Sequence, residues 1–223
     1  MGLPTPVDGQ GPRFFGVYPA IVTQLYDDPD HMGRVQVRFP SLGADGDRDV
    51  RAWATLCSPY ADADQGLQIM PEKDSQVVVA FEAGDFRRAY IVGAAWNGTT
   101  KLAYDPAQAN NIRMLRTRAD SRLEFDDTAG APKISITTKK GYKVVIDEGA
   151  QEITIAHPNK CTITLTASGT VDINGASAVN VKAPELNVTA ATSTFSGIVN
   201  CTTLNASVAI TSPLYSTGVG NLW

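Results

Sequence analysis

Apolar and polar residues alternate along most of the chain, and the alternation takes two forms. Over residues 14–98 it appears in runs of ordinary composition that are separated by turns rich in Gly, Pro and Asp. A period of two residues with such connections predicts β-strands. Five short strands with irregular loops favour a small Greek-key barrel of the OB-fold type for residues 14–98. The runs are FGVYPAIVTQLY, RVQVRF, WATLCSP, QVVVAFE and AYIVGAAW.

From residue 121 the alternation becomes a repeat of apolar pairs, and the two members of each pair stand two residues apart. From Ile134 onward the step between pairs is 10, 9, 10, 8, 8 and 7 residues. A near-regular strand-and-turn period is typical of solenoids, so we expect a β-structure over residues 121–223, after a linker with one short helical turn over 99–120. The pairs are Leu123/Phe125, Ile134/Ile136, Val144/Ile146, Ile153/Ile155, Ile163/Leu165, Val171/Ile173, Val179/Val181 and Leu186/Val188.

One chain has nothing against which to bury these pairs. A one-chain solenoid needs coils of roughly 20 residues or more, and these repeats are shorter. Burial of the seven pairs from Ile134 to Val188 would stabilise the structure by on the order of 20–40 kcal/mol, provided that another surface excludes water. Three copies wound about a shared axis supply that surface, with backbone bonds mostly between copies. We therefore expect an all-β homotrimer with an intertwined triple-stranded β-helix. Its inter-subunit core would be Ile134, Ile136, Val144, Ile146, Ile153, Ile155, Ile163, Leu165, Val171, Ile173, Val179 and Val181.

Composition and charge narrow the function classes. The chain is 43% hydrophobic with a net charge of −4, which gives no general affinity for nucleic acid. The one basic cluster, Arg113, Arg116, Arg118 and Arg122, is expected to form salt bridges between subunits. Residues 1–13 hold three Pro and three Gly and predict a flexible arm without a signal-peptide pattern. No apolar run approaches the roughly 18–20 residues that span a bilayer.

The reactive side chains do not form a recognisable site. Cys57, Cys161 and Cys201 make neither a disulfide framework nor a zinc pattern, and Cys161 is expected to be a small buried residue. His157 lies in an expected turn, and Asp27, Asp28 and Asp30 are interpreted as a solvated loop instead of a calcium site. No nucleophile–base arrangement can be argued from the spacing. We therefore expect no catalytic residue, no metal and no cofactor.

Several motifs in order carry a resemblance to a known family. Residues 14–98 resemble the OB-domain of phage baseplate assembly protein V, the central spike protein of contractile tails, and of the VgrG-like spikes of type VI secretion. LEFDDTAGAPKISITTKKGYKVVIDE, from Leu123 to Glu148, resembles the segment with which these spikes enter their triple-stranded β-helix. The OB motifs are DPDHMGRV at 28–35, RFPSL at 38–42, Pro71 with VVV at 77–79, Phe81 and Gly84-Asp85, and Val92-Gly93 with Asn97-Gly98.

The resemblance implies a homotrimeric spike in a virion tail baseplate or extracellular injection particle, assembled in the bacterial cytoplasm. Such a spike links the baseplate hub to the tip and pierces the target cell envelope when the sheath contracts. Many short spikes end in an iron-binding His-x-His pair, whereas this sequence ends in TSPLYSTGVGNLW. A separate PAAR-like tip protein is therefore expected, in contact with Tyr215, Leu222 and Trp223, and no nucleic acid is expected as a partner.

Two other functions are compatible with a β-helix. A tail fibre or adhesin would use it to display a site for a cell-surface carbohydrate, and would end in a larger head with exposed aromatic residues. A polysaccharide-cleaving enzyme would need an acidic cleft, which the charge-poor end does not supply. The spike is the favoured function, and the fibre or adhesin is the alternative.

Overall fold

The computed structural model describes residues 12–43, 49–209 and 211, so the expected arm of residues 1–13 lies almost wholly outside the described part. The described chain is β-structure and loops, and its one helical element is a short 3-10 turn, η1 (Glu82–Gly84). None of these residues forms a helix long and apolar enough to cross a membrane. The chain divides into two compact units, residues 1–176 and 177–223, which are described separately below.

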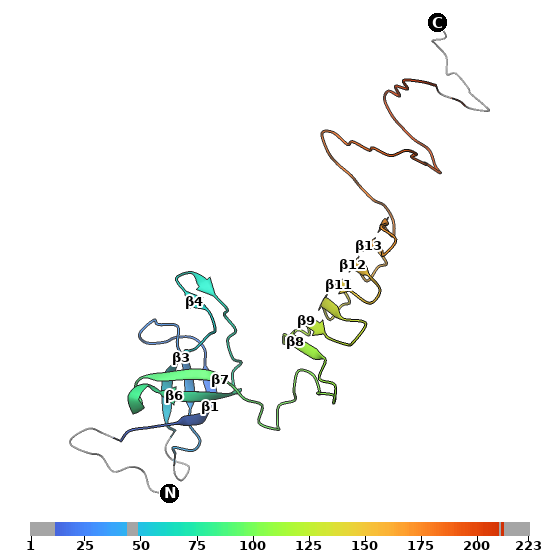
Figure 1. The fold of residues 1–223 in the computed structure, drawn as a ribbon. Coiled ribbons are helices and arrows are strands. Elements are labelled where there is room, and N and C mark those ends of the chain that lie inside the picture. Colours follow the sequence, from blue (N-terminus) through green and yellow to red (C-terminus); the bar gives the residue numbers. More distant parts are fainter. Residues whose placement is uncertain (1–11, 44–48, 210, 212–223) are drawn as a thin grey trace. The chain divides into compact units, whose positions relative to one another are not determined.

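Five strands of the first unit close into a barrel, as the sequence predicts (Figure 1). The strand order is β1-β2-β3-β7-β6, and every neighbouring pair is antiparallel except β3 and β7. A hairpin of two very short strands, β4 (Ala61–Asp62) and β5 (Gln65–Gly66), lies in the β3–β6 connection and was not predicted. The barrel strands are β1 (Val17–Gln24), β2 (Val35–Arg38), β3 (Arg51–Leu56), β6 (Gln76–Phe81) and β7 (Ala89–Ala94).

The alternation along the barrel strands places every second side chain in one core. Small β-branched residues and alanine fill the centre, and the inward-facing ones of β1, β2 and β6 are fully buried: Ala20, Val22, Val35, Val37, Val77 and Val79. Phe81 lies in a cluster of rings, with Phe14, Tyr18, Phe39 and Phe86 at centroid distances of 5.1–5.6 Å. Aromatic rings bury large areas, so this cluster is a major part of the barrel's stability.

Residues 112–174 form a second sheet in which each strand pairs with the next one along the chain (Figure 1). All six pairings are antiparallel, and the connections are turns of four to six residues. The strands are β8 (Ile112–Arg116), β9 (Arg122–Asp126), β10 (Lys133–Thr137), β11 (Lys143–Asp147), β12 (Glu152–Ala156), β13 (Thr162–Leu165) and β14 (Val171–Asn174).

Two details of this sheet differ from the expectations. β8 lies inside residues 99–120, where a linker with a helical turn was expected. The expectation that backbone bonds run mostly between copies is wrong for residues 112–174, because the ladders join strands of one chain. The physical reason is the short turns, which let each strand fold back at once on the previous one.

The second unit contains no paired strand within its described residues. The chain is extended between bends at residues 177, 184, 191, 196–197, 202 and 207–208 (Figure 1). Its apolar side chains are open to solvent: Val179, Val181, Leu186 and Val188 are 57–69% exposed. The alternating pattern is therefore present here without the ladder that accompanies it in β9–β14.

Candidate functional site

The register of the second sheet lines up the predicted apolar residues in a first column. Ile134 pairs across the ladder with Ile146, Ile146 with Ile153, Ile153 with Leu165, and Leu165 with Val171. Residues directly opposite one another on paired strands point to the same face of a sheet. These five side chains therefore form one continuous apolar column over five strands.

A second column runs beside the first, two residues away on each strand. It joins Ile136 to Val144, Val144 to Ile155, Ile155 to Ile163, and Ile163 to Ile173. Phe125 and Leu123 of β9 add one residue to the first and second column respectively. We call the surface made by the ten residues of the two columns on β10–β14 the apolar face.

The apolar face is the more exposed side of the sheet. Its ten side chains are 37–61% exposed, whereas Ser135, Val145, Thr154 and Thr164 on the opposite side are half-buried. Soluble proteins rarely leave such a continuous apolar surface uncovered, and a surface of this kind marks a site of association. One copy of the chain therefore presents the side that an assembled protein would have to cover.

Ten of the twelve predicted core residues are thus brought together on one face. Val179 and Val181 are not, because both follow the last strand, β14, and lie in the second unit. Tyr215, Leu222 and Trp223, the predicted contacts to a tip protein, lie outside the described residues. Their role stays a prediction.

The reactive side chains of the sheet accept hydrogen bonds from backbone N–H groups of the same chain. His157 follows β12, and its Nδ1 accepts a hydrogen bond from the backbone N–H of Asn159 at 3.2 Å. Cys161 is half-buried before β13, and its Sγ accepts from the N–H of Ala176 at 3.3 Å. Among the residues that the structure describes, no three His, Cys, Asp or Glu side chains gather in a way that could hold a metal ion.

The basic cluster makes ion pairs within one chain. Asp120 accepts from both Arg116 and Arg122, at 2.7 and 3.0 Å, and Arg113 lies 3.9 Å from Asp127. The two contacts of Asp120 close the β8–β9 turn and hold the pKa of Asp120 below its ordinary value, first through the bond from Arg122. The salt bridges between subunits that the sequence predicts for this cluster stay a prediction.

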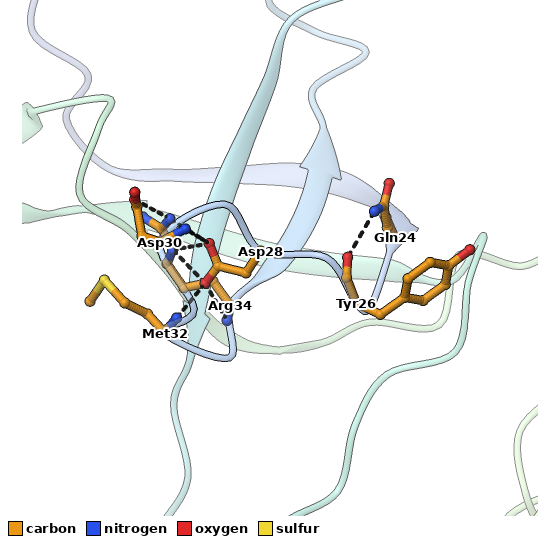
Figure 2. A network of polar contacts seen from close by, with 6 residues as sticks. All are labelled: Gln24, Tyr26, Asp28, Asp30, Met32 and Arg34. Carbon is orange, nitrogen blue, oxygen red and sulfur yellow. Dashed lines mark hydrogen bonds and ion pairs between the residues drawn. The ribbon is translucent and has the colours of Figure 1, made fainter.

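In the barrel, Asp28 is buried, which corrects its interpretation as part of a solvated loop (Figure 2). Only 6% of the residue is exposed, and its carboxylate accepts two bonds from the Arg34 guanidinium, from Nη2 at 2.6 Å and from Nε at 3.1 Å. The backbone N–H groups of Asp30, Met32 and Arg34 donate to the same carboxylate at 3.0–3.2 Å. Asp28 thereby organises the whole β1–β2 turn.

The environment of Asp28 favours its ionised form. The side-chain bond from Arg34, followed by the three backbone bonds, holds the pKa of the Asp28 carboxyl well below its ordinary value, against the opposing effect of burial. The same pair raises the pKa of Arg34. The six-residue spacing of Asp28 and Arg34 was visible in the sequence as part of a motif. Spacing alone, however, could not show that three N–H groups converge on the carboxylate.

We expect Asp28→Asn to destabilise the barrel, because Arg34, whose side chain is only 14% exposed, would lose its buried counter-ion and keep only the exposed Asp30. Since the folded-state pKa of Asp28 is depressed, its contribution is present above about pH 4 and is lost as the pH falls through the folded-state pKa. The thermal unfolding temperature should therefore fall more between pH 7 and pH 3 for the wild type than for Asp28→Asn. Asp27→Asn is the matched control, because Asp27 is exposed. An equal fall in unfolding temperature for the wild type and for Asp28→Asn would contradict the prediction.

Two family models match the chain in the order of its two sheets. Residues 18–96, the barrel, match the type VI secretion system/phage-baseplate injector OB domain. Residues 111–180, which begin one residue before β8, match the phage baseplate V C-terminal trimerisation domain. The exposed apolar face lies wholly within the second match, so a homotrimer accounts for its exposure in a single copy. The chain therefore belongs to the phage baseplate assembly protein V-like spike family, with an injector OB domain followed by a trimerisation domain.

Proposed function

We propose that the protein is the central spike of a contractile tail baseplate, which links the hub to the tip and pierces the target envelope when the sheath contracts. The family supports the baseplate role, and the apolar face carries the proposal for the spike itself. Three sheets facing one axis bury that face and form a stiff prism. The work of piercing then depends on shape and rigidity, without a chemical step.

In the trimer, each copy contributes one wall through its self-paired sheet. The ten residues of the apolar face, at roughly 1.5–3 kcal/mol for each fully buried side chain, are the main source of the association energy. The ladders within each wall are complete in one chain, so trimerisation adds side-chain packing over residues 112–174. This is the part of the predicted inter-subunit core that β10–β14 supply.

Residues 177–209 contribute in another way. Their extended segments between bends have open apolar side chains and no ladder of their own. Backbone N–H and C=O groups need partners when they are buried. In the proposed trimer these segments pair with those of the other copies, which is the intertwined part of the predicted β-helix and includes Val179 and Val181.

The partners follow from the two ends of the spike. The barrel binds the baseplate hub, and a separate PAAR-like tip protein binds beyond the described residues, at Tyr215, Leu222 and Trp223. The spike would be assembled in the bacterial cytoplasm, act in the virion or injection particle, and meet the target envelope only during contraction. No catalytic step is proposed for any residue of the chain.

The proposal predicts a trimer in which residues 177–209 form ladders only in the assembled state. Deletion of residues 177–223 should leave a trimer by light scattering but reduce its resistance to SDS, because the interchain ladders are lost. Parent particles that carry this shortened chain should contract without permeabilising target cells. A monomeric full-length chain, or particles that permeabilise normally with the shortened chain, would overturn the proposal. Deletion of residues 1–11, which precede the described barrel, is the matched control, since it leaves both sheets intact.

A further inference from the structure

The two long edges of the second sheet carry opposite charge. Because consecutive strands are antiparallel, β9 and β11 end at the edge where β10 and β12 begin. We call this the acidic edge, and the other, where β9 and β11 begin, the basic edge. With their turns, the acidic edge holds five carboxylates and two cationic residues, and the basic edge seven cationic residues and one carboxylate. The acidic edge comprises Asp126, Asp127, Asp147, Glu148, Glu152, Lys133 and Arg113, and the basic edge Arg116, Arg118, Arg122, Lys139, Lys140, Lys143, Lys160 and Asp120.

Many of these charges have no ion-pair partner in one chain. On the basic edge Lys139, Lys140 and Lys143 make no ion pair with any described residue, and on the acidic edge the same holds for Glu148 and Glu152. Lys133 at the acidic edge is already engaged by Asp147 at 2.7 Å. The unpaired charges of the two edges thus have opposite sign and lie on opposite sides of the same sheet.

We propose that the basic edge of each copy docks against the acidic edge of the next copy. The trimer is then closed at its three corners by rows of opposite charges, which we call the charged seams. The inference rests on the proposed trimer, and adds to it the surface that sets the direction and register of the copies. In a closed three-fold ring the interface is heterologous, so one edge of each copy meets the other edge of its neighbour. Opposite charges therefore meet at all three corners.

The arrangement also opposes one wrong assembly. A copy whose stack of strands ran upside down, with the apolar face still inward, would exchange its two edges. Both of its corners would then bring like charges together. Repulsion of this kind is a means of specificity, because it destabilises the competitor without any new contact in the correct assembly. The seams therefore favour three copies that run in the same direction.

The position of charges along the strands sets the axial register. β11 begins with Lys143 at the basic edge and ends with Asp147 at the acidic edge, and β9 has Arg122 and Asp126 in the same places. Copies at the same level thus place Lys143 beside Asp147 of the next copy. Neighbouring strands are about 4.8 Å apart, so a slip of one strand towards β10 would place Lys143 beside Lys133. A like-charge contact would result.

The test is a pair of edge reversals and their combination in the full chain. The basic-edge variant is Lys140→Glu with Lys143→Glu, and the acidic-edge variant is Asp147→Lys with Glu148→Lys. The combined variant carries all four changes, which exchanges the charges at the level of β11 on both edges, so that positions 143 and 147 of neighbouring copies again carry opposite charges. Reversal of two other exposed charges, Lys73→Glu with Lys101→Glu, is the control outside this sheet.

The readout is the rate of trimer formation on refolding, followed by light scattering at 50 mM and 1 M NaCl. We expect each edge variant to assemble about 10-fold or more slowly than the wild type at low salt, and the combined variant and the control to assemble at the wild-type rate. The differences should shrink at 1 M NaCl, where the screening length is about 3 Å. The proposal of charged seams would be contradicted if the edge variants assembled at the wild-type rate, or if the combined variant assembled no faster than either of them. In both cases the wild-type trimer would remain. A monomeric wild type would instead overturn the proposed function.

Discussion

A chain with the two substitutions Ile146→Asp and Ile155→Asp is expected to remain monomeric. The two residues lie in different columns of the apolar face, on the neighbouring strands β11 and β12. Their loss removes about 3–6 kcal/mol of apolar burial per copy. Three copies would in addition bring six carboxylates together near one axis, where burial without partners is strongly unfavourable. Mass by light scattering measures the outcome directly.

The matched control places the same charges on the other side of the same sheet. Thr154→Asp and Thr164→Asp change two half-buried residues that point away from the apolar face. This variant should remain trimeric, since its carboxylates can reach water. A trimer in both variants would show that the apolar face is not the interface. A monomer in both would also contradict the prediction, because loss of the trimer would then not depend on which side of the sheet carries the charge.

The strands of the barrel were predictable because their local pattern and their surroundings agree. Each run of alternating residues ends in Gly, Pro or Asp or is followed by one of them within two residues, and each has one buried side. β4 and β5 could not be predicted, because strands of two residues are too short to show alternation. β8 was not predicted for a related reason. Arg113 stands opposite Phe125, where an apolar residue would have continued the repeat.

The apolar repeat predicted the face correctly but not the pairing that builds it. A period of two residues says which side chains share a side, and β10–β14 follow it without exception. Whether the next strand comes from the same chain depends on whether each turn folds the chain straight back on itself, and the apolar pairs alone do not show that. Beyond Asn174 the same alternation continues through Val179 and Val181 without a ladder in the described chain. A pattern of side chains therefore predicts burial more reliably than it predicts the hydrogen-bond partner.

Charged residues were the least predictable from sequence. Asp28 and its neighbours looked like a solvated acidic loop, because carboxylates that stand together in a turn are usually exposed. The burial of Asp28 depends on Arg34, six residues later, and on three N–H groups that only the folded turn aligns. The order of residues along the chain does not show the separation of the two charged edges either. That separation arises because the chain reverses its direction at every turn.

Phe81→Ala is expected to unfold the barrel while the second sheet remains assembled. Phe81 contacts four other rings at the centre of the aromatic cluster, and a buried Phe→Ala change costs about 3–5 kcal/mol. That loss is a large part of the roughly 5–15 kcal/mol that stabilises a typical domain. Phe15→Ala, at a residue that is 63% exposed, should change stability little and serves as the control.

Calorimetry and light scattering together test this separation of the barrel from the sheet. The ladders of residues 112–174 pair only with one another, and their proposed cover comes from other copies, so the trimer does not require the barrel core. We expect the variant to show a lower barrel transition, an unchanged second transition and the mass of a trimer. A single transition that shifts as a whole would show that barrel and sheet unfold together. If barrel and sheet unfold separately, particles with the variant should contain an assembled spike that no longer binds the hub. The reason is that the proposed hub attachment depends on the barrel core, whereas the proposed piercing part depends on the core of the trimer.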